Sequence, residues 1–281
     1  MKFDLDTAWN EALALLRANF RLLLIVAGVF SFLPYFAATL LVPGLAEITG
    51  GQLDPNDAAT EARIQAFFMD YWWVMLLLSI VQGIGFLAMV TLLQRRANPT
   101  VGEALQFSLR AVLPYFAASL LFGLILGVAI LVPVTIGIAL QFTGAIVLGG
   151  ILAAVLFFYL FTKFSLISPV IAIGRQLNPI KAIAQSWRLT RGNSLRLFFF
   201  YALLIIAYLV ISAVIGLVFS LVFALGGAES QTFGQALSSS LMNAVFSLIF
   251  AAILAAVYAQ LGRVRTPPSV PPTGHGDQAE L

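Results

Sequence analysis

The chain has 281 residues and a formal net charge of +3, and 61% of its residues are hydrophobic while only 10% are charged. Soluble globular proteins carry about 25% charged residues, so this composition excludes a water-soluble domain and predicts an all-helical, multi-pass membrane protein. Because the sequence contains no cysteine, it also excludes disulfides, thiolate metal sites and a cysteine nucleophile.

Six apolar runs are long enough to cross a bilayer as helices. In chain order they are residues 20–42, 71–93, 114–136, 145–168, 195–222 and 238–260. Each provides about 20 residues or more, enough at about 1.5 Å per residue for a hydrocarbon core of about 30 Å. The first run is too long for the apolar part of a signal peptide, so we expect it to be retained as a span. Pro34, Pro133 and Pro169 fall within or near these runs and are expected to kink or end helices.

The basic residues gather on one side of the predicted spans. Fourteen of the fifteen Lys and Arg residues lie on one side of the spans. They occur in the two terminal segments, in the segments that follow spans two and four, or at the adjoining ends of the spans. The segments on the other side contain only Arg63. Because basic loops stay in the cytoplasm, we expect both termini to be cytoplasmic. An even number of spans agrees with this orientation.

A similar segment precedes each odd-numbered span: residues 6–20, 98–113 and 178–193. The segments start at Asp6, Asn98 and Asn178, residue types that cap helix N-termini. Apolar residues recur at helical spacing opposite polar and basic ones, so we expect amphipathic helices in the cytoplasmic interface. The chain would then consist of three repeats, each an amphipathic helix followed by a transmembrane hairpin. The alternative is that any basic linker between two spans has this composition.

The C-terminal segment differs in composition from the rest of the chain. From Arg263 it reads RVRTPPSVPPTGHGDQAEL, which is rich in proline and lacks apolar periodicity. We therefore divide the chain into a six-span membrane domain, residues 1–262, and a disordered cytoplasmic tail, residues 263–281.

The segment before the fifth span carries a distinctive motif. Residues 185–193 read QSWRLTRGN, and they are preceded by Asn178, Pro179, Ile180 and Ala182. This pattern resembles the signature of the glycerophosphoryl diester phosphodiesterase membrane-domain family. The resemblance implies a six-helix bacterial membrane module, and the hydrophobic layout of residues 1–262 is similar throughout.

Two departures from that family bear on function. Many members carry an acidic residue shortly after the fourth span, where this chain has Gly174 and Arg175, so no role that rests on that carboxylate carries over. Members that hydrolyse glycerophosphodiesters have a separate soluble barrel domain, for which we expect no room in this chain. The resemblance therefore implies the membrane module without the catalytic barrel.

Patterns that would support catalysis are weak in this sequence. The single histidine, His275, lies in the Pro-rich tail, and none of the twelve carboxylates falls within an apolar run. Metal-assisted hydrolysis needs clustered carboxylates or histidines to hold the ion. Asp70 lies beside an aromatic run that is typical of a membrane interface. We expect no enzyme activity, no metal site and no cofactor.

Few polar residues fall within the spans. Lys163 lies near the cytoplasmic end of the fourth span and is expected to extend its ammonium group to the interface. Gln82 in the second span and Asn243 in the sixth are candidates to line a polar cavity, although such residues more often bond across helices. Gly123 and Gly127 form a small-residue pair that favours close helix packing.

The basic interfacial segments are the strongest candidates for a functional site. Arginine binds phosphate through two hydrogen bonds and tryptophan anchors at headgroup depth, so we expect contacts with anionic lipid headgroups. The candidate residues are Lys181, Trp187, Arg188, Arg191, Arg196, Arg17, Arg21 and Arg110. The alternative is that these residues only determine topology.

The sequence thus predicts a non-catalytic membrane module that organises or regulates membrane-lipid or envelope processes through these helices. A small-molecule or lipid transporter is the alternative function. Membrane lipids, anionic ones above all, are the expected partners. Whether the protein forms a homo-oligomer or binds another membrane protein stays open. The sequence contains no nucleic-acid-binding motif.

Overall fold

A computed structural model of the protein describes residues 3–49, 57–94 and 99–265. Throughout these residues the chain forms helices and the turns between them, without a strand. Six helical stretches in this part of the chain are long and apolar enough to cross a membrane. They correspond to the six predicted spans and confirm the all-helical, multi-pass architecture.

The elements follow one another along the chain with short connections. They are α1 (Leu5–Ala27), the π-helical turn η1 (Gly28–Phe32), α2 (Leu33–Leu41), α3 (Leu45–Thr49), α4 (Ala58–Leu92), α5 (Val101–Ala139), α6 (Thr143–Phe164), α7 (Ile167–Ala172), α8 (Pro179–Thr190), α9 (Ser194–Ala224) and α10 (Gly227–Arg265). The first span combines α1, η1 and α2, and the fourth combines α6 and α7.

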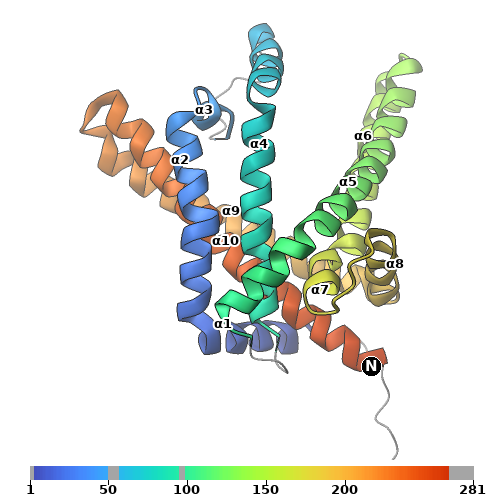
Figure 1. Ribbon diagram of the computed structural model, residues 1–281. Coiled ribbons are helices and arrows are strands. Elements are labelled where there is room, and N and C mark those ends of the chain that lie inside the picture. The colour runs from blue at the N-terminus through green and yellow to red at the C-terminus, as the bar shows by residue number, and fades with distance from the viewer. Residues whose placement is uncertain (1–2, 50–56, 95–98, 266–281) are drawn as a thin grey trace, which may run out of the picture.

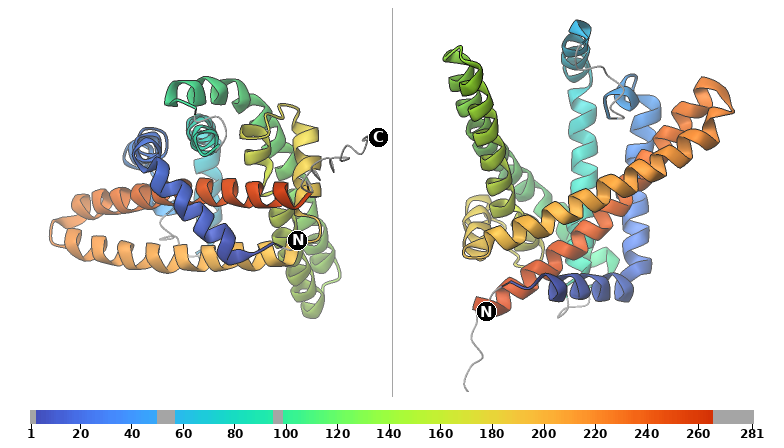
Figure 2. Two further views of the ribbon diagram at one scale, coloured as in Figure 1. Left: turned by 90° about the horizontal axis from the view of Figure 1, so that it is seen from below. Right: turned by 180° about the vertical axis from the view of Figure 1, so that it is seen from behind.

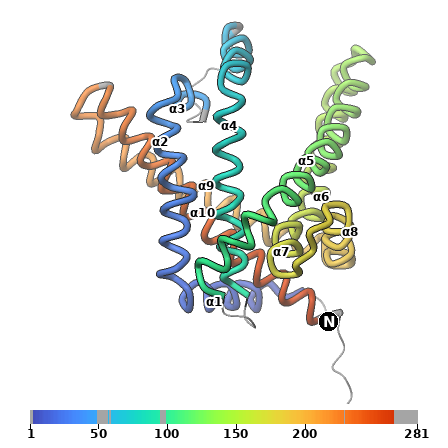
Figure 3. Tube along the Cα trace, in the orientation of Figure 1, coloured from blue at the N-terminus to red at the C-terminus, as the bar shows by residue number. Residues whose placement is uncertain are grey.

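Three helical hairpins rise from a common end of the molecule and diverge from one another (Figure 1). They pair α2 with α4, α5 with α6, and α9 with α10. We call the common end the base: α1 begins there, α7 and α8 lie there, and α10 ends there (Figure 2). The backbone trace in Figure 3 shows α5 and α6 leaning away from α4 towards their tips. Because the hairpins separate, much of their apolar surface is free to contact lipid, and the most apolar stretch of α9 contains no buried residue.

The buried core lies near the base. All six residues of α7 are buried, and α7 contacts α4, α5, α8 and α10. The part of α10 from Ala251 to Val257 is buried in the same core. The base is therefore where residues from all three hairpins pack together, and it fixes the positions of the short helices that carry the candidate site.

Helix α8 begins and ends as its sequence predicts. The side chain of Asn178 accepts a hydrogen bond from the Lys181 amide at 3.0 Å, and Pro179 occupies the first helical position. After the helix, Gly192 adopts a φ of +88°, a left-handed conformation that favours glycine, and the chain turns there into α9.

Helix α1 begins two residues earlier than expected. The side chain of Asp4, not Asp6, caps it by accepting a hydrogen bond from the Thr7 amide at 2.7 Å. Hydrogen bonds from the side chain and the amide of Thr7 hold the pKa of the Asp4 carboxyl below its usual value. The helix then continues through η1 into the first span, so this amphipathic segment is not a separate element.

The second expected amphipathic helix is continuous with its span as well. Thr100 and Glu103 form reciprocal hydrogen bonds between side chains and backbone amides at the start of α5. The expected start, Asn98, lies outside the described residues. Pro114 and Pro133 lie inside α5, where each removes one backbone hydrogen bond without ending the helix. Of the three expected amphipathic helices, only α8 is a separate element.

Two further boundaries differ from the prediction. Helix α6 ends at Phe164, and Pro169 lies in the separate short helix α7 that follows. Helix α10 continues to Arg265, so the first three residues of the predicted tail are helical. The rest of the predicted tail, 266–281, lies outside the described residues.

Candidate functional site

A basic and aromatic cluster lies at the base, where α8 packs against the end of α6. Lys163, in the last turn of α6, has only 4% of its surface exposed. Its Nζ atom lies 5.1 Å from the ring centroid of Trp187 on α8 and 5.5 Å from that of Tyr159. Aromatic faces attract a cation at these distances. The sequence predicted an ammonium group extended to the interface. In the structure the side chain is instead buried, and two aromatic rings flank its ammonium group.

Helix α8 is held against α6 by a hydrogen bond and by ring packing. The Ser186 hydroxyl donates to the carbonyl oxygen of Lys163 at 2.8 Å. The rings of Trp187 and Phe164 lie 5.5 Å apart between centroids. These contacts fix the position of Trp187 relative to Lys163, so the cation and the indole ring form one rigid unit.

Helix α8 contacts the protein through small residues. The fully buried residues of this helix are Ala182, Ser186 and Thr190, which are four residues apart. Their small side chains allow the helix to approach α6 closely. On its apolar side, Ile183 and Trp187 are partly buried against the core, whereas Ile180 is 68% exposed. An exposed apolar side chain at the base is available for contact with lipid.

Two exposed arginines, Arg188 and Arg191, follow Trp187 at the end of α8. Neither they nor Lys163 form an ion pair with a carboxylate among the described residues. Cations without a carboxylate partner attract anions, and the two exposed guanidinium groups are accessible to one. We call Lys163, Trp187 and Arg191 the α8 site.

Arg196, although close in sequence, makes different contacts. Its Nη1 atom donates a hydrogen bond to the carbonyl oxygen of Phe3 at 2.9 Å. The amide of Phe3 donates in turn to the Asn193 side-chain oxygen at 2.9 Å. Arg196 thus holds the N-terminal segment on α9, and the structure separates it from the other arginines with which the sequence grouped it.

An ion pair between the exposed Arg263 and the buried Glu11 joins the first and last helices at the base. Arg263 Nη2 lies 2.8 Å from Glu11 Oε1, and only 6% of the Glu11 side chain is exposed. Nearby, the Gln260 side-chain amide donates to the carbonyl oxygen of Asp4 at 3.2 Å. Sequence reasoning missed this pair because no local pattern connects residues so far apart along the chain.

The remaining candidate cations are exposed. Arg17 and Arg21 lie on α1, and Lys181 lies in the first turn of α8. Arg110 on α5 lines a cavity of about 360 Å³ together with Arg175. The guanidinium carbon of Arg175 lies 3.9 Å from the ring centroid of Phe107, which also lines that cavity. This cavity therefore contains a second pair of cations at the base.

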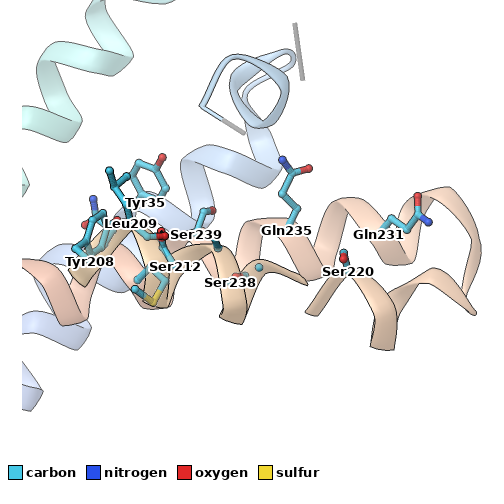
Figure 4. Close-up of a pocket in the computed structure, with 13 residues that line it drawn as sticks. Tyr35, Tyr208, Leu209, Ser212, Ser220, Gln231, Gln235, Ser238 and Ser239 are labelled. Carbon is cyan, nitrogen blue, oxygen red and sulfur yellow. The ribbon is translucent and has the colours of Figure 1, made fainter. Parts of the chain in front are cut away.

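Gln82 and Asn243, the polar candidates within the spans, line different cavities. Gln82 lines a cavity of about 390 Å³ between α4, α5 and α10, where Tyr115 also contributes. Asn243 lines a larger groove of about 710 Å³ between α2, α9 and α10 (Figure 4). The two residues therefore do not border a common passage.

Sequence reasoning missed most of the larger groove. On α9 its lining includes Tyr208, Ser212, Gly216 and Ser220, which recur at every fourth position and share one face of the helix. This spacing is visible in the sequence. The pattern is easily overlooked, because a single serine or glycine is common in a transmembrane helix.

Within the described residues, no group of three or more histidine, cysteine or acidic side chains is placed to hold a metal ion. No family model, curated protein or solved structure matches the chain. The family resemblance noted above therefore depends on the motif at residues 178–193 and on the hydrophobic layout.

Proposed function

We propose that the protein is a non-catalytic membrane module that binds anionic lipid headgroups at its base. The observation that carries this proposal is the α8 site, where Lys163 lies against Trp187 and the exposed Arg191 ends the same helix, without a carboxylate partner among the described residues. A lipid phosphate can accept hydrogen bonds from the Arg191 guanidinium, while the largely buried Lys163 adds positive charge to the base. Trp187 adds a ring of the kind that occupies the headgroup region of bilayers.

Lipid is favoured over a soluble anion by the surroundings of the site. Exposed apolar side chains lie on both sides of it along the chain, including Ile180 on α8 and Leu195 at the start of α9, which is 69% exposed. Such side chains enter the acyl region when the cations contact headgroups. The Arg110 and Arg175 cavity is also lined by Glu103, whose carboxylate makes it less suited to an anionic headgroup than the α8 site.

We place the protein in a bacterial inner membrane with the base and both termini on the cytoplasmic side. The distribution of basic residues supports this orientation. In that orientation the α8 site faces the cytoplasmic leaflet, where a surface rich in anionic lipid attracts basic segments. The module would organise or regulate lipid-related processes of the envelope there, as the motif at residues 185–193 suggests by its family resemblance.

Reporter fusions test the proposed orientation. A reporter that is active only in the periplasm should be active when fused after residue 55 or residue 230. The same reporter should be inactive when fused after residue 100, 180 or 265. Activity at 180 would contradict the six-span model, because that position lies at the start of α8.

Lipid retention tests the α8 site. Native mass spectrometry of the purified protein with equal amounts of phosphatidylglycerol, cardiolipin and phosphatidylethanolamine should show preferential retention of the anionic lipids. Each basic residue near an anionic surface contributes about 1 kcal/mol. We therefore expect the double variant Lys163→Met, Arg191→Gln to lower that preference by about tenfold or more.

The matched control is Arg17→Gln, Arg21→Gln, which removes the same number of charges from the exposed surface of α1. This variant should lose much less of the preference. An equal loss in both variants would mean that only the net charge of the base matters. If the loss of Lys163 disturbs packing, the single variant Arg191→Gln still tests the site, because it changes only an exposed residue.

A lipid transporter is the second candidate function, favoured by the polar cavities between the spans. Polar side chains in apolar helices often border the path of a substrate. Reconstituted vesicles distinguish the two functions. A transporter should accelerate the movement of a fluorescent lipid between leaflets, whereas a binding module should leave that rate at the value of protein-free vesicles.

A further inference from the structure

The groove between α2, α9 and α10 is lined by two polar stripes that face each other. The stripe on α9 consists of Tyr208, Ser212, Gly216 and Ser220. The stripe on α10 consists of Gln231, Gln235, Ser238, Ser239 and Asn243. Figure 4 shows the labelled residues of both stripes on the two arms of the hairpin, with Tyr35 contributed by α2. From Tyr208 to Ser220 the groove follows about 18 Å of helix, more than half of a hydrocarbon core of about 30 Å.

The polar atoms of the groove include both hydrogen-bond acceptors and donors. The hydroxyls of Ser212, Ser220 and Ser239 donate to carbonyl oxygens of their own helices, at 3.1, 2.8 and 3.2 Å. Their oxygen lone pairs remain as acceptors, and the side-chain amides of Gln231 and Asn243 carry N–H donors. A ligand with hydroxyl groups, which both donate and accept, matches this mixed lining.

The groove carries no charge along its described lining. A charged headgroup would therefore lose its hydration at this site without gaining a counter-ion. An uncharged group with several hydroxyls loses less on leaving water, and it can donate to the serine oxygens and accept from the side-chain amides of the lining. The residues that line the groove thus favour a polyhydroxyl group such as a sugar or glycerol.

The position of the groove favours a lipid as the source of that group. Helix α9 exposes apolar side chains next to the groove, among them Leu209 and Leu217. Gly216 leaves the wall of the groove open, because a Cβ atom built there would have no neighbour within 4 Å. A volume of about 710 Å³ is in the usual range for a small-molecule site. Acyl chains attached to the hydroxylated group can remain in the surrounding bilayer.

We propose that the groove between α2, α9 and α10 binds the uncharged, hydroxyl-bearing headgroup of a membrane lipid of the glycosyl diacylglycerol class. This site is separate from the α8 site, which selects for anionic groups at the base. The protein then contacts two chemically different lipids, one by charge and one by hydrogen bonding.

Native mass spectrometry tests the groove. The full chain is purified in a detergent without a sugar headgroup and mixed with equal amounts of monogalactosyl diacylglycerol, phosphatidylethanolamine and phosphatidylglycerol. The variant Gly216→Leu should fill the groove and lower retention of the galactolipid by about tenfold. Gly123→Leu is the matched control, because Gly123 is also an open glycine but lies on α5. It should retain the galactolipid as the wild type does.

A second variant tests the hydrogen-bonding chemistry without filling the groove. Ser212→Val, Asn243→Leu replaces two acceptors by apolar groups of similar size and should also lower galactolipid retention. Both groove variants should keep the retention of phosphatidylglycerol, and Lys163→Met, Arg191→Gln should keep that of the galactolipid. This separates a failure at the groove from a failure at the base.

Three results would overturn the proposal. The wild type could show no preference for the galactolipid over the other two lipids, or the groove variants could retain it as well as Gly123→Leu does. Binding of free methyl galactoside as tight as that of the galactolipid would identify a soluble sugar, rather than a lipid, as the ligand of the groove.

Discussion

Replacing Gly149 with valine should destabilise the protein strongly, whereas the same change at the next residue, Gly150, should be tolerated. Both glycines lie in α6, and only Gly149 faces α5. A Cβ atom on Gly149 would lie 2.5 Å from the carbonyl oxygen of Pro133 and 3.6 Å from the Cα of Gly137. The neighbour that would have to move is backbone, so it cannot yield by changing a side-chain rotamer. A Cβ atom on Gly150 has no neighbour within 4 Å.

Overpacking of this kind costs about 1–3 kcal/mol and occasionally more. Substitutions at open surface positions usually change stability by less than about 0.5 kcal/mol. Thermal unfolding in detergent, followed by tryptophan fluorescence, measures the difference, since the chain contains four tryptophans. Equal unfolding temperatures for the two variants would show that α5 and α6 do not meet at Gly149.

Removing the guanidinium group of Arg263 is the second change with a large expected effect. In Arg263→Met the buried carboxylate of Glu11 loses the partner that lies 2.8 Å away in the wild type. A buried polar group that loses a partner costs about 1–3 kcal/mol, and more when it is charged. Arg188→Met is the matched control, because Arg188 is exposed at the same end of the molecule and forms no ion pair among the described residues.

A double variant tests whether the cost comes from the buried carboxylate charge. Adding Glu11→Gln to Arg263→Met removes the charge that in the single variant no longer faces the Arg263 guanidinium. We therefore expect the double variant to unfold at a higher temperature than Arg263→Met alone. If the two unfold at the same temperature, the Glu11 carboxylate does not depend on Arg263.

The spans could be predicted because the constraints that create them are local. A run such as 195–222 must be helical in lipid whatever the rest of the chain does. The basic residues at its N-terminal end predict that this end lies on the cytoplasmic side. Helix starts were less predictable. Asn178 caps α8 as expected, but Asp4 caps α1 in place of Asp6, since two acids two residues apart look equally suitable in the sequence.

Contacts between helices could not be predicted because they depend on which faces meet. Gly123 and Gly127 have the spacing of a packing motif, yet a Cβ atom on either would meet nothing within 4 Å. Gly149 makes the close approach instead, and its small-residue spacing with Ala145 and Ala153 did not distinguish it from Gly123 and Gly127. Similarly, Lys163 lies beside Trp187 only because α8 folds back onto α6. The residue pattern within either segment does not predict this contact.

The contacts that join the first and last helices have a consequence for biogenesis. Arg263 is synthesised 252 residues after Glu11, and Gln260 is 256 residues from Asp4. The contact between the Glu11 carboxylate and Arg263 can therefore form only after α10 has been synthesised. Until then the face of α1 that packs against α10 has no helix to cover it.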